Sequence, residues 1–420
     1  MNPDQILGEL EAKLDIILPS DIIEPEKIRP RAIQSRARKS ITSLEAEMQG
    51  ALELLKKDDR LPQILFKVAN LHLSEGNYAR AVMLYEITLG MDSNQIAAWI
   101  NMGLAYMQVG ETKDAASCFG SALAIDERNV IALVYMSMAQ RALGNFDSCQ
   151  KHLELALQID PNNPRARYGK GCFHKVRGDY VNAITWLRRS LDVDENFAPS
   201  LIELGRLYLH LKQHEKAVEV LKKILRIDPE EAYAYSILGD VFLEVKDYNQ
   251  CLFYYDRAVS IKFDDPNLWI KKGDIHKLLK SYKQAHDAYQ KAINANPEYI
   301  EAWAKSGENL LLMKEDDVAL EYFNTALALD PNNAEVAHRR GLVYFALEKF
   351  EEALTDFDIA FSVEADNPEH LYYRALCLEK LGRIKEAKRT WQVALALYEE
   401  VGNETRVAEC NARIRRLSHT

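Results

Sequence analysis

Small and large apolar side chains recur along most of this chain with a period of 34 residues. One slot of the period holds a small residue ten times in succession, without an insertion or a deletion. Twelve residues later comes a column of Ala and Cys, and four residues after that a column of large apolar side chains. Spacings of three and four place such residues on one face of a helix. The small slot holds Ala69, Gly103, Ser137, Gly171, Gly205, Gly239, Gly273, Gly307, Gly341 and Ala375.

Polar residues, prolines and glycines mark the ends of two helices in each period. Asn163, Asp265 and Asn367 each stand directly before a Pro, and this pair favours a helix start because the side chain caps orphan N–H groups and Pro has none to lose. Gly110 and Gly144 fall where a turn separates the two helices. A Gly inside a helix costs about 1 kcal/mol relative to Ala. We therefore expect a second helix to fill the space beside the small column.

The pattern resembles that of the tetratricopeptide repeat (TPR) family, whose signature is W-x₂-L-G-x₂-Y…A-x₃-F…P over 34 residues. Trp99, Gly103 and Tyr106 carry it in the second repeat, and the resemblance covers Pro62 to about Val401. It implies an all-α fold, an α-solenoid in which stacked antiparallel helix pairs form a right-handed superhelix. Because a solenoid grows by adding units, the repeat rather than the chain length sets the domain organisation.

The sequence divides into four expected parts. Residues 1–28 hold a short amphipathic helix over 4–18 and a Pro-containing linker, residues 29–61 an N-terminal capping helix, residues 62–401 ten repeats, and residues 402–420 a C-terminal capping helix. Two hypotheses remain for the N-terminal part. It either covers the exposed face of the first repeat, as solenoids require, or docks in a groove of its own solenoid or of a second copy. The apolar positions of the first helix are Ile6, Leu7, Leu10, Leu14, Ile17 and Leu18.

Composition narrows the class of protein. A net charge of −10 argues against nucleic acid as a partner, and the basic run from Lys27 to Lys39 has no aromatic residue between its charges to stack on bases. The six cysteines form no C-x-x-C pair, which indicates reduced, structural thiols. No apolar run approaches the ~18 residues of a spanning helix. We expect a cytoplasmic protein with no membrane association.

Catalytic signals are missing from the sequence. It contains no nucleophile motif, phosphate loop or metal-ligand spacing. His72, His174 and His276 share one slot but stand three repeats apart, too far to share a metal ion. The sequence therefore predicts a protein that is not an enzyme, with no catalytic residue, no metal and no cofactor.

The family implies that the first helix of each repeat lines a concave surface on which peptides lie. The expected groove surface is apolar in the second and third repeats and basic, with one aromatic residue, in the fourth and fifth, where Arg165, Lys175 and Arg206 accompany Tyr168. The slot after the small residue is then acidic over three repeats. The acids either pair with Lys271 and Lys305, three residues before an acid on the same helix, or form a stripe that receives a basic or mixed-charge peptide. The candidate peptide-binding residues are Asn70, Asn101, Tyr168, Arg206, Asp240, Asp274 and Glu308.

Asn70 and Asn101 can be compared with the peptide-binding residues of one group of family members. Some relatives hold the C-terminal carboxylate of chaperone tails with a clamp of Lys, Asn and Arg over three repeats. Asn70 and Asn101 match the asparagines of that clamp, but Phe66, Ile131 and Tyr135 stand at its basic positions. The resemblance thus does not extend to binding of such tails.

These observations favour a scaffold or adaptor that binds a protein or peptide segment in its concave groove. The alternative is a self-associating structural protein, a homo-oligomer in which residues 1–28 fill a groove. The identity of the partner is not encoded in any motif of the sequence.

Overall fold

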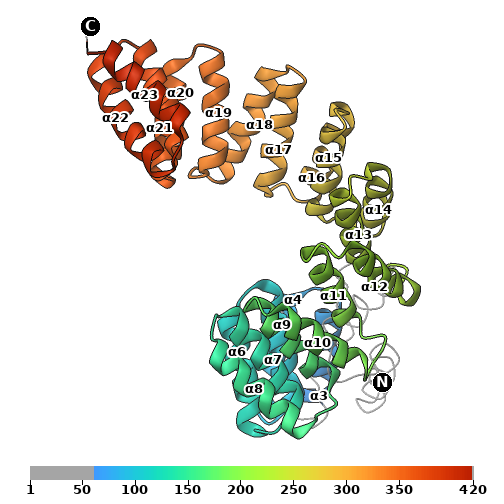
Figure 1. Ribbon diagram of the computed structural model, residues 1–420. Coiled ribbons are helices and arrows are strands. Elements are labelled where there is room, and N and C mark those ends of the chain that lie inside the picture. The colour runs from blue at the N-terminus through green and yellow to red at the C-terminus, as the bar shows by residue number, and fades with distance from the viewer. Residues whose placement is uncertain (1–60, 419–420) are drawn as a thin grey trace, which may run out of the picture. The chain divides into compact units, whose positions relative to one another are not determined.

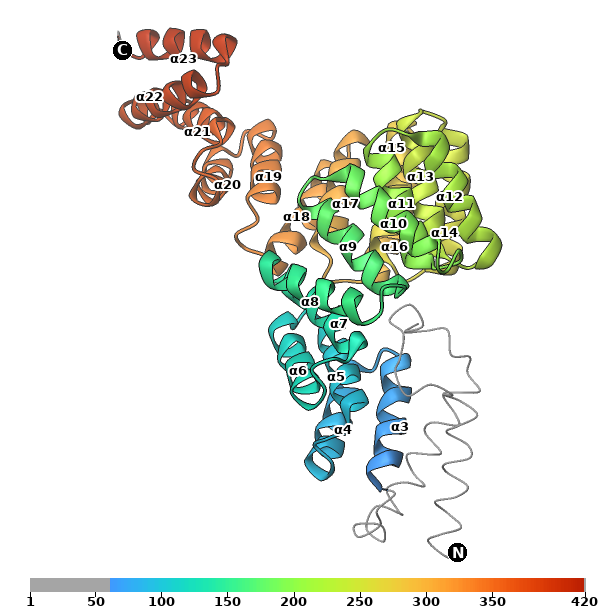
Figure 2. The ribbon, with the colours of Figure 1, turned by 60° about the horizontal axis from the view of Figure 1, so that its bottom comes forward.

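The computed structural model describes residues 61–418, which form 21 α-helices and, over this range, no strand. Contacts between Cα atoms divide the chain after Ile227 into two compact units. In each unit the helices form antiparallel pairs that follow one another in chain order, as Figures 1 and 2 show by their labels and colours. The predicted all-α architecture of stacked helix pairs is confirmed, and its ten pairs run from α3 to α22.

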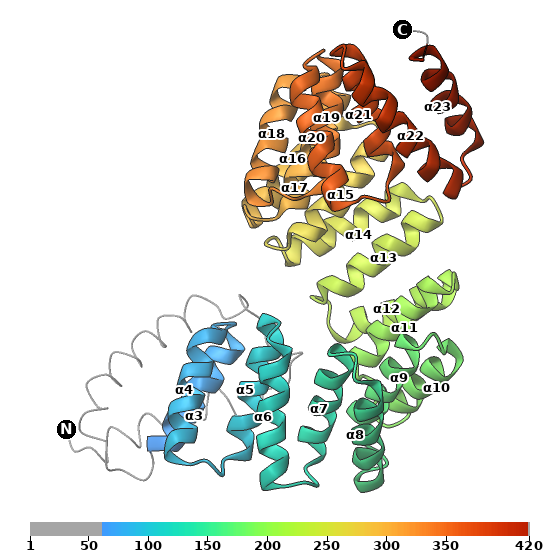
Figure 3. The same ribbon diagram turned by 90° about the vertical axis from the view of Figure 1, so that its left-hand side faces the viewer.

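The first unit contains five helix pairs. Figure 3 shows the pairs from α3 to α10 side by side. We call the earlier member of a pair its first helix and the later member its second helix. The pairs are α3 (Leu61–Ser74) with α4 (Tyr78–Met91), α5 (Ile96–Val109) with α6 (Thr112–Ile125), α7 (Val130–Ala142) with α8 (Phe146–Ile159), α9 (Pro164–Val176) with α10 (Tyr180–Leu191), and α11 (Ala198–His210) with α12 (His214–Ile227).

The second unit contains five further pairs and one closing helix. The pairs are α13 (Ala232–Glu244) with α14 (Tyr248–Ile261), α15 (Pro266–Leu278) with α16 (Tyr282–Ala295), α17 (Ile300–Leu312) with α18 (Asp316–Leu329), α19 (Ala334–Ala346) with α20 (Phe350–Val363), and α21 (Pro368–Lys380) with α22 (Ile384–Glu400). Helix α23 (Glu404–Arg416) follows α22 without a partner helix.

The small column allows the two helices of a pair to approach closely. A Cβ atom added to Gly273 would lie 2.5 Å from Cε1 of Tyr289, which belongs to the large apolar column of the same repeat. The Tyr289 side chain is fully buried, with 0% of its surface exposed. The expected partner helix therefore fills the space beside the Gly, which explains why seven of the ten repeats accept a poor helix former at this slot.

Caps and turns define the helix ends as the sequence predicts. The Asn163 side chain accepts a hydrogen bond from the Ala166 N–H at 2.9 Å, and Asp265 and Asn367 cap their helices in the same way. The turn inside each pair requires a left-handed residue, and Gly110 supplies it with φ of 87°. Five later repeats have a side chain there, at φ between 56° and 62°, which is a strained conformation. These residues are Lys212, Lys246, Lys280, Lys314 and Glu348.

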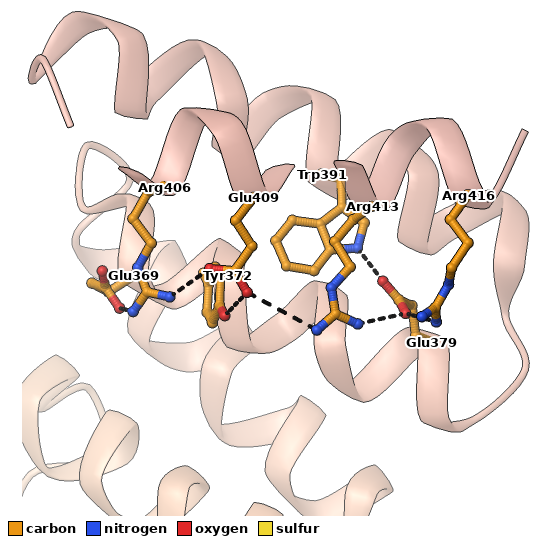
Figure 4. Close-up of polar contacts among 8 residues, drawn as sticks. All are labelled: Glu369, Tyr372, Glu379, Trp391, Arg406, Glu409, Arg413 and Arg416. Carbon is orange, nitrogen blue, oxygen red and sulfur yellow. Dashed lines mark hydrogen bonds and ion pairs between the residues drawn. The ribbon is translucent and has the colours of Figure 1, made fainter. Parts of the chain in front are cut away.

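Helix α23 packs against the last pair through charged and aromatic side chains (Figure 4). Arg406 lies 3.9 Å above the centre of the Tyr372 ring and pairs with Glu369 at 3.3 Å. Glu379 accepts hydrogen bonds from the Trp391 indole N–H at 2.6 Å, and from Arg413 and Arg416 at 3.2 and 3.1 Å. The closing helix thus covers the outward side of the last repeat. The expected parts at residues 1–28 and 29–61 lie outside the described residues, apart from Leu61, with which α3 begins.

Candidate functional site

An open groove of about 850 Å³ crosses the first helices of four successive repeats in the second unit. We call it the second-unit groove. Its walls come from α13, α15, α17 and α19, and one ring from α14 joins them. The lining residues are Asp240, Leu243, Tyr255, Lys271, Asp274, Ile275, Lys277, Leu278, Lys305, Glu308, Leu311, Leu312, Arg339 and Leu342.

The three predicted acids lie in this groove, and each pairs with a cation from the next repeat. Lys271 Nζ lies 2.6 Å from Asp240 Oδ2, and Lys305 Nζ lies 3.6 Å from Asp274 Oδ2. In the third pair, Arg339 of the next repeat lies 3.0 Å from Glu308. The expected pairing within one helix, of Lys271 with Asp274 and of Lys305 with Glu308, is therefore wrong. Side chains 31 residues apart meet because the first helices of adjacent repeats stack side by side.

A fourth cation, Lys277, lies close to two of these three acids. Lys277 lies 3.9 Å from Asp274 on its own helix and 3.2 Å from Glu308 on the next first helix. Three carboxylates thus face four cations in the groove, so the row carries one net positive charge. Every charged side chain in it retains partial solvent exposure, and pairs of this kind contribute about 0–1 kcal/mol each to stability.

Two buried tyrosines donate hydrogen bonds to two acids of the row. The hydroxyl of Tyr255 donates to Asp240 Oδ1 at 2.5 Å, and that of Tyr289 donates to Asp274 Oδ1 at 2.7 Å. Burial, and then the neighbouring carboxylate, raise the pKa of both tyrosines, so both remain protonated donors. These rings also fill the space beside Gly239 and Gly273. The repeat packing therefore fixes the orientation of the carboxylates before any ligand arrives.

An apolar strip borders the charged row. Leu278 and Leu312 occupy the last position of their first helices, one repeat apart, and 56% and 50% of their surfaces are exposed. Leu243, Leu311 and Leu342 extend the strip along the groove. Sequence reasoning missed these leucines because it followed only the slot after the small residue. The 34-residue step from Leu278 to Leu312 was the signal that could have found them.

The other predicted residues lie in the first unit. Asn70 and Asn101 are buried, and the Asn101 amide donates to Asn70 Oδ1 at 2.8 Å. The Tyr85 hydroxyl donates to the same oxygen at 2.6 Å. These asparagines thus bond side chains of the first two repeats.

Tyr168 and Arg206 lie on consecutive first helices of the first unit. The Tyr168 ring meets Phe197 edge-on at 6.0 Å between centroids, and burial raises the pKa of its hydroxyl. Arg206 is exposed to solvent. Lys175 and Glu203 form a close ion pair between the same two helices.

The described residues 61–418 contain neither a cluster of metal-ligating side chains nor a membrane-spanning helix. No three of their His, Cys, Asp and Glu side chains are placed to bind one metal ion. None of their helices combines the length and apolar character needed to cross a bilayer. All six cysteines are buried free thiols within this range.

Sequence comparison finds models of the tetratricopeptide repeat along most of the described chain. They match residues 98–130, 132–163, 177–241, 232–265, 266–299, 300–333 and 338–400. No curated protein matches the chain.

Several solved structures are similar to parts of the chain. MamA shares 25% identity over 42% of this chain and 96% of its own, with a TM-score of 0.37. YrrB, described as a TPR protein with an unusual peptide-binding site, shares 24% identity over 44% of this chain and 96% of its own, with a TM-score of 0.37. A tetratricopeptide repeat protein from Parabacteroides merdae ATCC 43184 shares 14% over 59% of this chain and 98% of its own, with a TM-score of 0.46.

Proposed function

The chain belongs to the tetratricopeptide repeat family, whose members generally mediate protein–protein interactions, and we propose that it is a non-catalytic scaffold that binds a peptide segment of a partner protein in the second-unit groove. The observation that carries this proposal is the groove itself, in which an exposed apolar strip runs beside a row of preformed ion pairs. Since the six cysteines are buried thiols, a reducing compartment suits the protein, and we place it in the cytoplasm.

The dimensions of the groove fit a chain segment. Neighbouring packed helices lie about 8–10 Å apart, so each repeat step equals roughly three residues of an extended peptide at about 3.3 Å per residue. The same step equals about six or seven residues of a helix at 1.5 Å per residue. A ligand with apolar side chains at either spacing would cover Leu278 and Leu312 together.

The charges of the groove favour a polypeptide over nucleic acid. A phosphate backbone would meet Asp240, Asp274 and Glu308 at every repeat step, and three carboxylates against four cations leave little net attraction. A peptide presents backbone N–H and C=O groups and charges of both signs. It can therefore bond to acids and cations of the row without an unpaired charge in the interface.

Leucine-to-aspartate substitutions test the proposal directly. A displayed library of random peptides is selected against the purified full chain, and the binders are titrated against Leu278→Asp and Leu312→Asp variants. Burying a leucine contributes about 1.5–3 kcal/mol, so each variant should lose at least about tenfold in affinity. Val363→Asp is the matched control, because Val363 is 49% exposed on the second helix α20, away from the groove.

Two outcomes of the peptide selection would contradict the proposal. Peptides that bind the Leu278→Asp and Leu312→Asp variants as tightly as the unmodified chain would place the binding surface elsewhere. A library that yields no binder at about micromolar affinity would remove the proposal for this groove.

A further inference from the structure

Two acids of the second-unit groove already have hydrogen-bond donors within the protein. Asp240 accepts from the Tyr255 hydroxyl at 2.5 Å and, through both carboxylate oxygens, from Lys271 at 2.9 and 2.6 Å. Glu308 accepts from Lys277 at 3.2 Å. A ligand cation at either acid would compete with a lysine of the protein. It would also enter a row that already carries one more positive charge than negative.

One cation of the groove, Lys305, has unused hydrogen-bond donors. Its ammonium group lies 3.6 Å from Asp274 Oδ2, which is too long for a hydrogen bond. The other oxygen of Asp274 accepts from the Tyr289 hydroxyl at 2.7 Å. Within residues 61–418 the Lys305 side chain donates no hydrogen bond, although an ammonium group has three donors. Since this side chain is 29% exposed, a ligand can reach it.

Lys305 lies in the middle of the groove and on the same helix as part of its apolar strip. It belongs to α17, and α15 and α19 provide walls on either side. Leu312 ends α17 seven residues later, about 10 Å along the helix axis. The long lysine side chain spans part of this distance. A segment that covers Leu278 and Leu312 can therefore place a neighbouring side chain against the Lys305 ammonium group.

We propose that Lys305 binds the carboxylate of an Asp or Glu side chain in the bound segment, so that the second-unit groove selects peptides in which an acid neighbours the apolar residues. The inference rests on the proposed peptide-binding function and specifies its ligand. One ligand carboxylate balances the four cations of the row, and it supplies the acceptor that Asp274 is too distant to be. A side chain fits this position better than a chain end, because the groove continues past Lys305 on both sides.

A double-mutant cycle on selected peptides tests this assignment. Peptides that lose affinity for the Leu278→Asp and Leu312→Asp variants are retained as groove binders, and their sequences should share an acid at a fixed distance from the apolar residues. The Asp or Glu is then replaced by Asn or Gln, and both peptides are titrated against the unmodified full chain and Lys305→Met. Removing either charge should weaken binding at least about fivefold. Removing both should cost no more than removing one.

Two further lysine variants serve as controls. Lys283→Met removes an exposed lysine of the second helix α16, outside the groove, and should bind both peptides like the unmodified chain. Lys305→Arg keeps the charge and should still distinguish the acid peptide from its amide. Should circular dichroism show that Lys305→Met is unfolded, Lys305→Gln replaces it. The comparison of the two peptides on the unmodified chain needs no variant at all.

Three results would overturn the assignment. The first is an amide peptide that responds to Lys305→Met as strongly as the acid peptide does. The second is a set of groove binders with no shared acid, or with Lys or Arg in its place. The third is a loss of affinity on amidation of the peptide C-terminus alone, which would transfer the contact to a chain end. Each result leaves the peptide-binding function standing, since the two leucine variants judge that function independently.

Discussion

Substituting Gly103 by Ala tests whether close helix packing explains the small column. Gly103 lies inside α5, where Ala would ordinarily be the better helix former by about 1 kcal/mol. A Cβ atom at this position would lie 2.5 Å from Cε1 of Phe119, and 2.9 Å from two further atoms of the same ring. The intrinsic preference and the packing therefore act in opposite directions.

We expect the steric cost of the added Cβ atom to exceed the gain in helix preference. Phe119 is fully buried at 0% exposure, and its ring stacks on Tyr135 with 5.8 Å between centroids. The ring cannot withdraw without displacing a second aromatic side chain. Overpacking of a well-packed core costs about 1–3 kcal/mol, so after the gain in helix preference we expect Gly103→Ala to destabilise the first unit by about 1–2 kcal/mol.

Gly120→Ala is the matched control in the same repeat. Gly120 lies inside α6, and the nearest atom to an added Cβ is Met136 Cε, at an ordinary contact distance of 3.6 Å. Since nothing opposes the better helix former, this variant should be stabilised by up to about 1 kcal/mol. The same chemical change is thus expected to have opposite signs in two helices of one pair.

Thermal unfolding followed by far-UV circular dichroism measures the difference. For a unit of this size, 1 kcal/mol shifts the midpoint by roughly 2–4 °C. Hydrogen exchange of α5 and α6 then locates the change within the repeat. A Gly103→Ala chain as stable as Gly120→Ala would refute the packing account of the small column.

Three further predictions concern the second unit. Lys280→Gly should stabilise it by about 1 kcal/mol in urea unfolding, because Lys280 holds a φ of 58° that Gly adopts without strain; a lower urea midpoint would contradict this. Burial, and then the charge of His370, lower the pKa of His338 to about 4, below its usual value of about 6.5. The unfolded chain therefore binds the proton first, so stability should be full above about pH 6.5 and fall toward about pH 4; thermal midpoints should show a smaller loss in His338→Gln. Glu379→Ala should destabilise the closing helix by about 3 kcal/mol, because Glu379 is 8% exposed at its side chain and accepts from three donors. Arg416→Ala, at an exposed partner, should cost under about 1 kcal/mol in the same thermal assay.

The sequence predicted the features that depend on local chemistry. The caps at Asn163, Asp265 and Asn367 and the left-handed turn at Gly110 follow from what each residue can do within a few positions. The 34-residue period adds the register of the pairs, because every repeat supplies an independent observation of the same contact.

The side-chain partners inside the groove could not be predicted in this way. Sequence spacing identifies Lys271 as the helical neighbour of Asp274, but the adjacent first helix brings Asp240 closer to the lysine. Which acid Lys271 pairs with depends on how two helices stack. Residue spacing within one helix contains no information on that stacking. Leu278 and Leu312 were missed for a related reason, since apolar side chains at a helix end are exposed only where no second helix reaches them.

The arrangement of charges in the second-unit groove bears on specificity more than on affinity. Its ion pairs are partly exposed and preformed, so a ligand neither creates nor breaks a buried charge there, and each pair is worth only about 0–1 kcal/mol. A ligand that buries the exposed strip gains more binding free energy, about 1.5–3 kcal/mol for each of Leu278 and Leu312 that it covers. The row nevertheless repeats at each step, so a ligand shifted along the strip by half a step would place like charges opposite one another. Such repulsion disfavours the intermediate registers, whereas a shift by one full step meets the same arrangement of charges.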